Sequence, residues 1–282
     1  MTGTPDGLPP LSEVIRAHGL SARKGLGQNF ILDLNLTRRI ARAAGPLDAV
    51  NIVEIGAGPG GLTRALLLEG AAKVYAVERD ERCLPALEEI ASHYPGRVEI
   101  LRGDALEMDL SELAPSPARI VANLPYGAST ELLARWLTTE PWPPWYDRMV
   151  LMFQREVAER IVSAPGCKAF GRLSVLAQWR TSPRKLLNLP PRAFTPAPKV
   201  DSTLVEFVPV PEPEPAGSCA ALQQVVATAF GQRRKMLRKS LRSLMQEPEK
   251  TLESIGIDPS LRAEALSVSE FCALARIWHA NN

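Results

Sequence analysis

Four consecutive residues, Asn123-Leu124-Pro125-Tyr126, place two hydrogen-bond acceptors beside an aromatic ring. The exocyclic amine of adenine is a poor nucleophile because its lone pair is delocalised into the purine ring. The Asn123 side-chain oxygen and the Pro125 carbonyl can accept its two hydrogens, which favours a pyramidal nitrogen with an exposed lone pair. Tyr126 offers a ring on which the base can stack, worth roughly 1–3 kcal/mol. The tetrapeptide indicates chemistry on the amine of an unstacked base, driven by positioning and electrostatics.

A glycine-rich segment, Gly56-Ala-Gly-Pro-Gly-Gly61, follows a predicted strand and precedes a predicted helix. Glycine lets the backbone turn sharply and lets a ligand approach the peptide groups closely. The spacing fits the Gly-x-Gly-x-x-Gly fingerprint of dinucleotide-binding proteins. With Glu54 in front, it also fits the Glu-x-Gly-x-Gly-x-Gly loop of class I S-adenosylmethionine-dependent methyltransferases. A tight strand-to-helix turn without a ligand is the third interpretation.

Two carboxylates at predicted strand ends suit a nucleoside. Glu78 lies about 20 residues beyond Gly58, where an acid can accept both ribose hydroxyls of either cofactor. Asp104 can accept from an adenine amino group, although by itself it is equally typical of a turn. Asn123-Leu124-Pro125-Tyr126 alone would describe a proline turn with a buried tyrosine. A dehydrogenase has no evident use for it after the fourth strand, so the combination favours the methyl donor.

Residues 51–153 alternate between strand-like and helix-like segments. Strands are predicted at 51–55, 73–77, 97–101, 119–122 and 148–153, and helices at 62–69, 82–93 and 130–138. This alternation predicts a parallel sheet covered by helices on both faces, with ligands bound at the carboxyl ends of the strands. Beyond it, helices are predicted at 156–163 and 172–179, and strands at 185–189 and 203–208.

A proline-rich segment divides the chain. Four prolines fall within residues 209–217, which excludes a continuous helix or strand and predicts a linker. The predicted domains are 1–208, which binds the cofactor, and 218–282, which is helical. Helices are predicted there at 222–230, 235–245, 259–266 and 270–277, the third capped by Asp258-Pro259 and the fourth by a capping box from Ser267 to Glu270.

Composition excludes several classes of protein. The chain has 282 residues, 45% of them hydrophobic, and a net charge of +2, values that suit a globular enzyme rather than a disordered chain. No stretch approaches the roughly 18 consecutive apolar residues of a membrane helix, and the first twenty residues do not form a secretory signal. The scattered thiols Cys83, Cys167, Cys219 and Cys272 lie far from any histidine, which predicts a reducing cytoplasm and no metal site.

One segment concentrates positive charge. Residues 231–246 contain six cations and no acid: Arg233, Arg234, Lys235, Arg238, Lys239 and Arg242. On a helix of about four turns they could neutralise several phosphates, and binding would weaken steeply with salt. Such a surface would recognise the shape and phosphates of RNA rather than its bases. A solvated basic helix face is the alternative. Arg16, Arg23 and Lys24 form a smaller cluster.

The chain resembles the ribosomal RNA adenine N6,N6-dimethyltransferases. Its glycine loop, Glu78, Gly103-Asp104-Ala105 and the tetrapeptide match four family motifs in the family's order. Further matches are Lys24-Gly-Leu-Gly-Gln-Asn-Phe30, Phe194-Thr-Pro-Ala-Pro-Lys-Val-Asp-Ser202, Phe230-Gly-Gln-Arg-Arg-Lys235 and Leu266-Ser-Val268. Several independent motifs in one order make the resemblance specific, and they extend it over nearly the whole chain.

The resemblance implies a Rossmann-like class I methyltransferase fold: an α/β domain with a mixed seven-stranded sheet, followed by a smaller all-α domain. It implies S-adenosyl-L-methionine as cofactor, S-adenosylhomocysteine as product, and no metal. The expected reaction is dimethylation of the N6 amines of two adjacent adenosines in the 3′-terminal hairpin loop of small-subunit (16S) rRNA, with a role in small-subunit biogenesis. The expected partner is that rRNA, the small ribosomal subunit or its precursor. The enzyme itself is expected to be monomeric and cytoplasmic, without membrane contact.

The resemblance also assigns roles to individual residues. Catalysis is assigned to Asn123, Leu124, Pro125, Tyr126 and Phe194, whose ring would pack against the target base opposite Tyr126. Cofactor contacts are assigned to Gln28, Asn29, Phe30, Glu54, Gly56, Gly58, Gly60, Glu78, Asp104, Ala105 and Asn123. RNA contacts are assigned to Arg233, Arg234, Lys235, Arg238 and Lys239.

One position departs from the family pattern. An Asn commonly follows the tetrapeptide in the family, where this chain has Gly127; the change could loosen the loop but removes neither acceptor. Two alternatives stay open at this stage. One is a large-subunit rRNA adenine methyltransferase, whose members often have Ile in place of Leu124 and lack the Leu-Gly before Gln28. The other is a non-enzymatic ribosome-assembly factor that keeps the fold.

Overall fold

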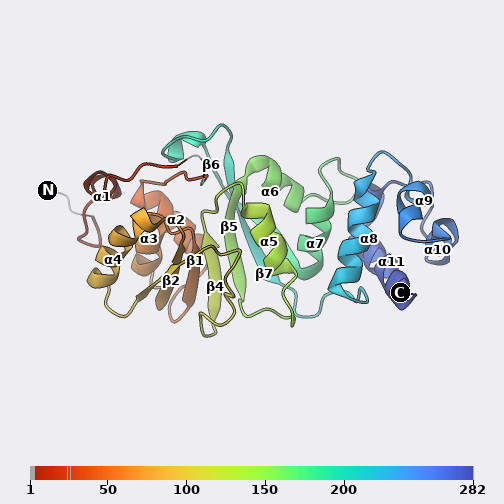
Figure 1. The fold of residues 1–282 in the computed structure, drawn as a ribbon, viewed down its shortest axis with the longest axis horizontal. Coiled ribbons are helices and arrows are strands. Elements are labelled where there is room, and N and C mark those ends of the chain that lie inside the picture. Colours follow the sequence, from red (N-terminus) through yellow and green to blue (C-terminus); the bar gives the residue numbers. More distant parts are fainter. Residues whose placement is uncertain (1–3, 24, 26, 282) are drawn as a thin grey trace. The chain divides into compact units, whose positions relative to one another are not determined.

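Seven strands form one sheet in the order β3-β2-β1-β4-β5-β7-β6 (Figure 1). They are β1 (Asn51–Ile55), β2 (Lys73–Glu78), β3 (Val98–Arg102), β4 (Ala118–Ala122), β5 (Arg148–Gln154), β6 (Thr181–Leu189) and β7 (Ser202–Pro209). The first five are parallel, and β7 is antiparallel to β5. The computed structural model describes residues 4–23, 25 and 27–281. The predicted mixed seven-stranded sheet is confirmed.

Strand β1 lies between β2 and β4. Its side chains from Ile52 to Ile55 are all buried, as expected for a strand covered on both faces. The chain continues from β1 through β2 to β3 in one direction, whereas β4 and β5 extend in the other. The strand order therefore reverses beside β1, and the crevice at its carboxyl end is where open α/β sheets bind ligands.

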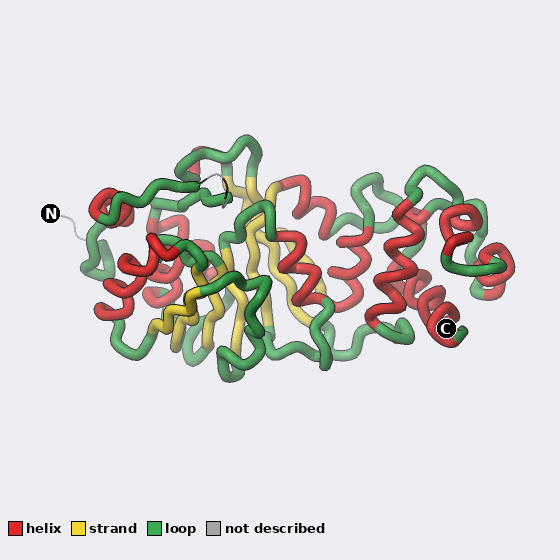
Figure 2. The backbone as a smooth tube through the Cα atoms, in the orientation of Figure 1, coloured by secondary structure: helices red, strands yellow, loops and turns green. Residues whose placement is uncertain are grey.

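Helices connect and cover the strands (Figure 2). Those up to the start of β6 are α1 (Leu11–Ala17), α2 (Leu34–Ala43), α3 (Gly61–Leu68), α4 (Leu84–His93), α5 (Ser129–Leu137), α6 (Arg155–Ile161) and α7 (Arg172–Arg180). Helix α2 packs on α3, α3 on β2, and α4 on β3. The apolar side chains of α3, such as Leu66, fill a buried cluster that also contains Ile52 and Val74 of the sheet.

The described chain divides into two compact units. The first comprises residues 1–133, 144–158 and 184–208, and the second comprises 134–143, 159–183 and 209–282. Residues 210–218 form no helix or strand. The second unit also contains 134–143 and 159–183, which the sequence predicts as part of the first domain. The expected domain limits and linker stay predictions.

The second unit is built around α8 (Cys219–Gly231), α11 (Val268–Ala280) and α7. The Phe230 and Phe271 rings stack with centroids 5.6 Å apart, and Phe170 lies 6.3 Å from Phe230. The predicted capping box is confirmed, since Ser267 and Glu270 exchange side-chain and backbone hydrogen bonds at the start of α11. Aromatic packing and a capped helix together define this core.

Two predicted helices of this unit were wrong. In place of a helix over 235–245 there is a short α9 (Leu237–Ser240) followed by a 3₁₀ turn, and 259–266 contains only a 3₁₀ turn at Ala263–Ala265. The backbone of Met236 is extended, with ψ 151°. The Leu237 amide donates to the Leu261 carbonyl (2.7 Å), so the two segments pair with each other instead of each forming a helix. Asp258 accepts from the Ser260 amide (2.8 Å) as a turn residue, not as a helix cap.

Three helices were not predicted: α1, α2 and α10 (Pro248–Ser254). A cap signal for α2 was present in the sequence, because Asp33 accepts from the Asn35 amide at its N-terminus (2.8 Å). Among the described residues, every helix is too short or too polar to cross a bilayer.

Candidate active site at the carboxyl ends of the strands

A cavity of about 490 Å³ opens in the first unit at the carboxyl ends of the parallel strands. Most of the predicted site residues line it: Gln28, Asn29, Phe30, Glu54, Gly56, Gly58, Glu78, Asp104, Ala105, Asn123, Leu124, Pro125 and Tyr126. Gly60 and Phe194 are not among its lining residues. Leu11, Val77, Arg79 and Leu132 also line it, and sequence reasoning missed them.

The glycine loop brings its backbone close to neighbouring segments. Gly56 and Gly58 have φ values of 71° and 55°, a region that side chains with a Cβ rarely adopt. A Cβ on Gly58 would also lie 3.3 Å from the Phe30 ring. At Gly60, whose φ is 85°, a Cβ would lie 2.1 Å from Ile90 Cδ1. Glycine at that position is explained by its positive φ and by the close approach of Ile90 from α4, and its predicted cofactor contact stays a prediction.

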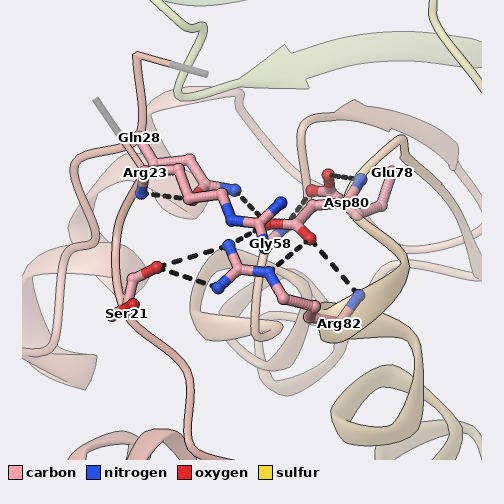
Figure 3. A network of polar contacts seen from close by, with 7 residues as sticks. All are labelled: Ser21, Arg23, Gln28, Gly58, Glu78, Asp80 and Arg82. Carbon is pink, nitrogen blue, oxygen red and sulfur yellow. Dashed lines mark hydrogen bonds and ion pairs between the residues drawn. The ribbon is translucent and has the colours of Figure 1, made fainter. Parts of the chain in front are cut away.

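Glu78 ends β2 with its carboxylate buried (5% exposed). One oxygen accepts from the Gly58 amide and the other from the Asp80 amide, each at 2.7 Å (Figure 3). Burial raises the pKa of this carboxyl, and the two amide donors oppose that effect. Glu78 therefore shapes the glycine loop and also contributes to the cavity wall.

Asp80 was missed by sequence reasoning, although it stands two residues beyond Glu78. Its Oδ2 accepts from Gln28 Nε2 (2.8 Å) and from Arg82 Nη2 (2.6 Å) (Figure 3). The Arg82 guanidinium lowers the pKa of Asp80 to about 2. The Gln28 side-chain oxygen accepts from the Arg23 amide (2.9 Å), so both ends of the Gln28 amide are engaged. Gln28 thus holds the N-terminal segment on the sheet, and its predicted cofactor contact stays a prediction.

Asp104 is a turn residue, and its predicted contact with an adenine amine stays a prediction. Its carboxylate accepts from the Leu106 amide (3.0 Å), as in a turn, and from Arg79 (2.8 Å). The same residue lines the cavity beside Ala105. Asp104 therefore forms a turn at the cavity wall, with one carboxylate oxygen bonded to the Leu106 amide and the other to Arg79.

The amide group of Asn123 has a defined orientation. Its Nδ2 donates to the Asn29 carbonyl (3.0 Å). A carbonyl can only accept, so this contact assigns the nitrogen and leaves Oδ1 as the free acceptor. The Pro125 carbonyl accepts from the Ala128 amide (3.1 Å) and keeps a second lone pair. The Tyr126 hydroxyl lies 2.5 Å from Ser202 Oγ.

Gly127, which follows the tetrapeptide, has an ordinary backbone conformation and open space around it. Its φ is not in the left-handed region, and a Cβ built there meets nothing within 4 Å. A side chain would fit at this position, so the departure from the family pattern leaves the arrangement of Asn123 and Pro125 intact.

Phe194 lies in the hydrophobic core and does not contact the cavity. It is 3% exposed and belongs to the same buried cluster as Ile31 and Leu189. Its neighbour Thr195 is anchored by a reciprocal backbone pair with Phe30. Contact of the Phe194 ring with a target base stays a prediction, one that requires the ring to leave this packing.

Glu54 is the most buried acid of the cavity wall (1% exposed). Burial raises its pKa to about 8, opposed by a hydrogen bond from Thr63 Oγ1 (2.6 Å) and reinforced by the nearby charge of Glu78. In the free protein at neutral pH this carboxyl is largely protonated. A cation bound beside it would favour the ionised form.

We expect the free protein to lose stability as the pH rises from about 4.5 to about 8. In this window folded Glu54 keeps its proton while the unfolded chain releases it, so raising the pH favours unfolding. The loss should total about 3–5 kcal/mol, at about 1.4 kcal/mol per pH unit. In urea unfolding, the stability of Glu54→Gln, which keeps an acceptor for Thr63, should depend less steeply on pH than that of the parent. The raised pKa of Glu78 contributes in the same direction. The control Glu99→Gln, at an exposed acid, should retain the parental slope of unfolding free energy against pH. If Glu54→Gln showed the same slope as the parent, Glu54 would not be the origin of the pH dependence.

The basic segment of the second unit is less free than its sequence suggests. Arg233 donates to the carbonyls of Lys168 (2.5 Å) and Phe170 (2.6 Å) and lies 3.8 Å from Glu264. Arg238 lies 3.9 Å from Glu249. The expected basic helix of about four turns was wrong, because beyond the end of α8 only Leu237–Ser240 is α-helical in this segment. The segment itself contains no acid, but the fold brings Glu264 and Glu249 to it from other parts of the chain. Within the described chain, no ion pair engages the remaining cations of the segment: Arg234, Lys235, Lys239 and Arg242.

Two further sequence predictions concern the N-terminal segment and metals. Lys24 and Leu26 lie outside the described residues. Across residues 4–23, 25 and 27–281, no group of three or more metal-ligating acids, histidines or cysteines is found.

Comparison with known proteins gives consistent matches. A family model described as ribosomal RNA adenine dimethylase matches residues 19–279. Ribosomal RNA small subunit methyltransferase A of Ruegeria sp. (strain TM1040) is 60% identical over 272 residues, 96% of this chain and 97% of that protein. The protein of the same name from Rhodopseudomonas palustris (strain TIE-1) is 62% identical over 271 residues, 96% of this chain and 94% of that protein. A dimethyladenosine transferase from Plasmodium falciparum has a similar fold, with a TM-score of 0.72 at 24% identity, covering 86% of this chain and 94% of that chain.

Proposed function

This chain belongs to the ribosomal RNA adenine dimethylase family, and we propose on that premise that it dimethylates the N6 amines of two adjacent adenosines in small-subunit rRNA. The methyl donor of this family is S-adenosylmethionine, and the target is proposed to lie in the 3′-terminal hairpin loop. The single observation that carries the proposal is the placement of Asn123 and Pro125 on the same cavity wall as Gly56 and Gly58.

The residues of the cavity suit the methyl donor. A volume of about 490 Å³ falls in the range typical of cofactor sites. Glu78 is proposed to accept from the ribose hydroxyls and Asp104 from the adenine amine, since Glu78 ends β2 and Asp104 follows the end of the neighbouring strand β3 by two residues. Glu54 is proposed to face the cationic methionine end, where its ionisation would be favoured. When bound, the cofactor supplies an electrophilic methyl group on a sulfonium.

The tetrapeptide is proposed to hold the target amine. Asn123 Oδ1 accepts one N6 hydrogen, because its amide nitrogen is already committed to the Asn29 carbonyl. The second lone pair of the Pro125 carbonyl accepts the other hydrogen. The Tyr126 ring stacks against the base, which must first leave the RNA stack. No strong general base is required, because the nitrogen becomes acidic once it has been methylated.

The direct test uses full-length protein, labelled methyl donor and small subunits that lack the modification. We expect label in dimethyladenosine after digestion to nucleosides, and none with the Asn123→Ala variant. Large subunits in a parallel reaction test the large-subunit alternative. Label in large subunits alone would replace the proposed substrate, and RNA binding without label in either would favour a non-enzymatic assembly factor.

Contact with RNA phosphates is proposed for the exposed cations Arg234, Lys235, Lys239 and Arg242. Arg233 is proposed to have a structural role instead, because its guanidinium bonds to two backbone carbonyls and lies near Glu264. Arg238, which lies 3.9 Å from Glu249, is proposed to contact an RNA phosphate as well. The surface recognises phosphate and shape, as is usual for proteins that bind structured RNA.

We expect Arg234→Glu/Lys235→Glu to weaken binding to small-subunit rRNA without changing cofactor affinity. Loss of two phosphate contacts should reduce the slope of log affinity against log salt by about 2, measured by filter binding over a range of KCl. The matched control Arg39→Glu/Lys185→Glu makes the same charge change on exposed residues of the first unit. Equal weakening in both variants would assign the effect to net charge, and a lost cofactor affinity would contradict the proposed division of roles.

A further inference from the structure

The Tyr126 hydroxyl has a buried partner. Tyr126 lines the cavity, and its hydroxyl lies 2.5 Å from Ser202 Oγ. Ser202 is fully buried (0% exposed) and does not line the cavity. This hydrogen bond restricts the tyrosine ring, because breaking it would leave the buried hydroxyl of Ser202 without its partner.

Ser202 itself is held by the sheet. It is the first residue of β7 and lies opposite Gln154, the last residue of β5, in the antiparallel register. Just before it, the Asp201 carbonyl accepts from the Arg155 amide (2.9 Å), and the Asp201 carboxylate pairs with the Arg155 guanidinium (3.1 Å). The anchor for the tyrosine hydroxyl is therefore part of a rigid strand end rather than a free loop.

The connection between β6 and β7 reaches the other end of the tetrapeptide as well. Thr195 exchanges two backbone hydrogen bonds with Phe30 (2.9 and 2.8 Å). The carbonyl of the preceding residue, Asn29, accepts from Asn123 Nδ2. The connection thus supports the segment at Asn29 and Phe30 that orients the Asn123 amide. The same connection ends at Ser202, which anchors the Tyr126 hydroxyl.

We propose that Ser202 is a positioning residue for methyl transfer, which acts by fixing the ring of Tyr126 before the target base arrives. This inference rests on the proposed function, in which the base stacks on Tyr126. Without the anchor, the ring can rotate, and the base loses its alignment with the acceptors of Asn123 and Pro125. Misplacement of a reacting group by about 1 Å can cost on the order of 100-fold in rate. The effect is expected on kcat, because Ser202 is buried and does not line the cavity.

The test compares Ser202→Ala, Tyr126→Phe and the double variant in the full-length protein with small subunits as substrate. Each single variant removes one partner of the same hydrogen bond, so we expect each to lower kcat about 10- to 100-fold. The KM values for cofactor and subunit should stay within about 3-fold of the parent. The double variant should be no slower than the slower single variant, because the bond can be lost only once.

Thr203→Val is the matched control. Thr203 is also fully buried on β7, but its hydroxyl bonds to Asn188 Oδ1 (2.8 Å), away from the tetrapeptide. If lost stability alone slowed the enzyme, Thr203→Val would lower kcat as much as Ser202→Ala does when the two variants have the same melting temperature. That result would overturn the proposal. A parental kcat in Ser202→Ala, or additive losses in the double variant, would overturn it as well. Failure of the proposed function is distinguishable, since the parent would then not methylate small subunits at all, or Tyr126→Ala would turn over like the parent.

Discussion

Replacement of Asn123 by alanine is expected to abolish methyl transfer to small-subunit rRNA, with a fall of at least about 10²–10³-fold in kcat. The variant removes the acceptor for one hydrogen of the target amine, and loss of a single preorganised polar group in an active site typically costs that much. Binding to RNA should remain nearly unchanged, because the exposed cations of the second unit are untouched. Single-turnover transfer and filter binding measure the two quantities separately.

A second substitution at this position tests the orientation of the amide. Asn123→Asp keeps oxygen acceptors but removes the donor to the Asn29 carbonyl, so that two oxygens would face each other at the present 3.0 Å contact. We expect this variant to be nearly as slow as Asn123→Ala. Asn35→Ala, at an exposed asparagine of α2, serves as the control and should turn over like the parent. Parental turnover in Asn123→Ala would refute the role of this residue in catalysis.

Replacement of Glu78 by alanine is expected to weaken cofactor binding by about 100-fold or more. The variant removes the proposed acceptor of the ribose hydroxyls, and a hydrogen bond to a charged group is worth roughly 1.5–3 kcal/mol. It also leaves the amides of Gly58 and Asp80 without their present acceptors, which disturbs the glycine loop. Titration calorimetry with S-adenosylhomocysteine, well below the melting temperature, measures the affinity of the folded protein.

Glu78→Gln separates shape from charge. The glutamine fills the same space, but one end of its amide would be a donor facing the Gly58 or Asp80 amide, both of which are donors themselves. We expect this variant to bind the cofactor more weakly than the parent and to unfold at a lower temperature. Glu99→Ala, an exposed acid on β3 that pairs with Lys73, should retain parental affinity. If Glu78→Ala kept parental affinity, the proposed ribose site would be wrong.

The N-terminal segment illustrates how the site is assembled from distant parts of the chain. Gln28 meets Asp80 across 52 positions, Tyr126 meets Ser202 across 76, and Asn123 meets Asn29 across 94. The parallel strands make this possible, because their carboxyl ends meet at one edge of the sheet. The glycine loop occupies the centre of that edge, where the strand order reverses.

Much of this arrangement could be predicted from the sequence alone. Strands β1 to β5 are short, largely apolar runs, and β1 and β3 are followed directly by glycine. Such patterns report local backbone preference and burial directly. The glycine loop, Glu78, Asp104 and Asn123 to Tyr126 each stand at the end of one strand, so the topology of a parallel sheet was sufficient to place them in one cavity. The capping box at Ser267 is a local signal in the same sense.

Only the tertiary structure decided which polar groups are already engaged and where marginal helices end. Gln28 and Arg233 carry no local sign that Asp80 and two backbone carbonyls occupy them, and Phe194 carries none that its ring lies in the core. The basic segment has helical periodicity, yet it breaks at Met236 because the amides that follow bond to the 259–261 segment. Periodicity reports the preference of a short stretch of chain, whereas hydrogen-bond partners many residues away exist only once the fold has brought them together.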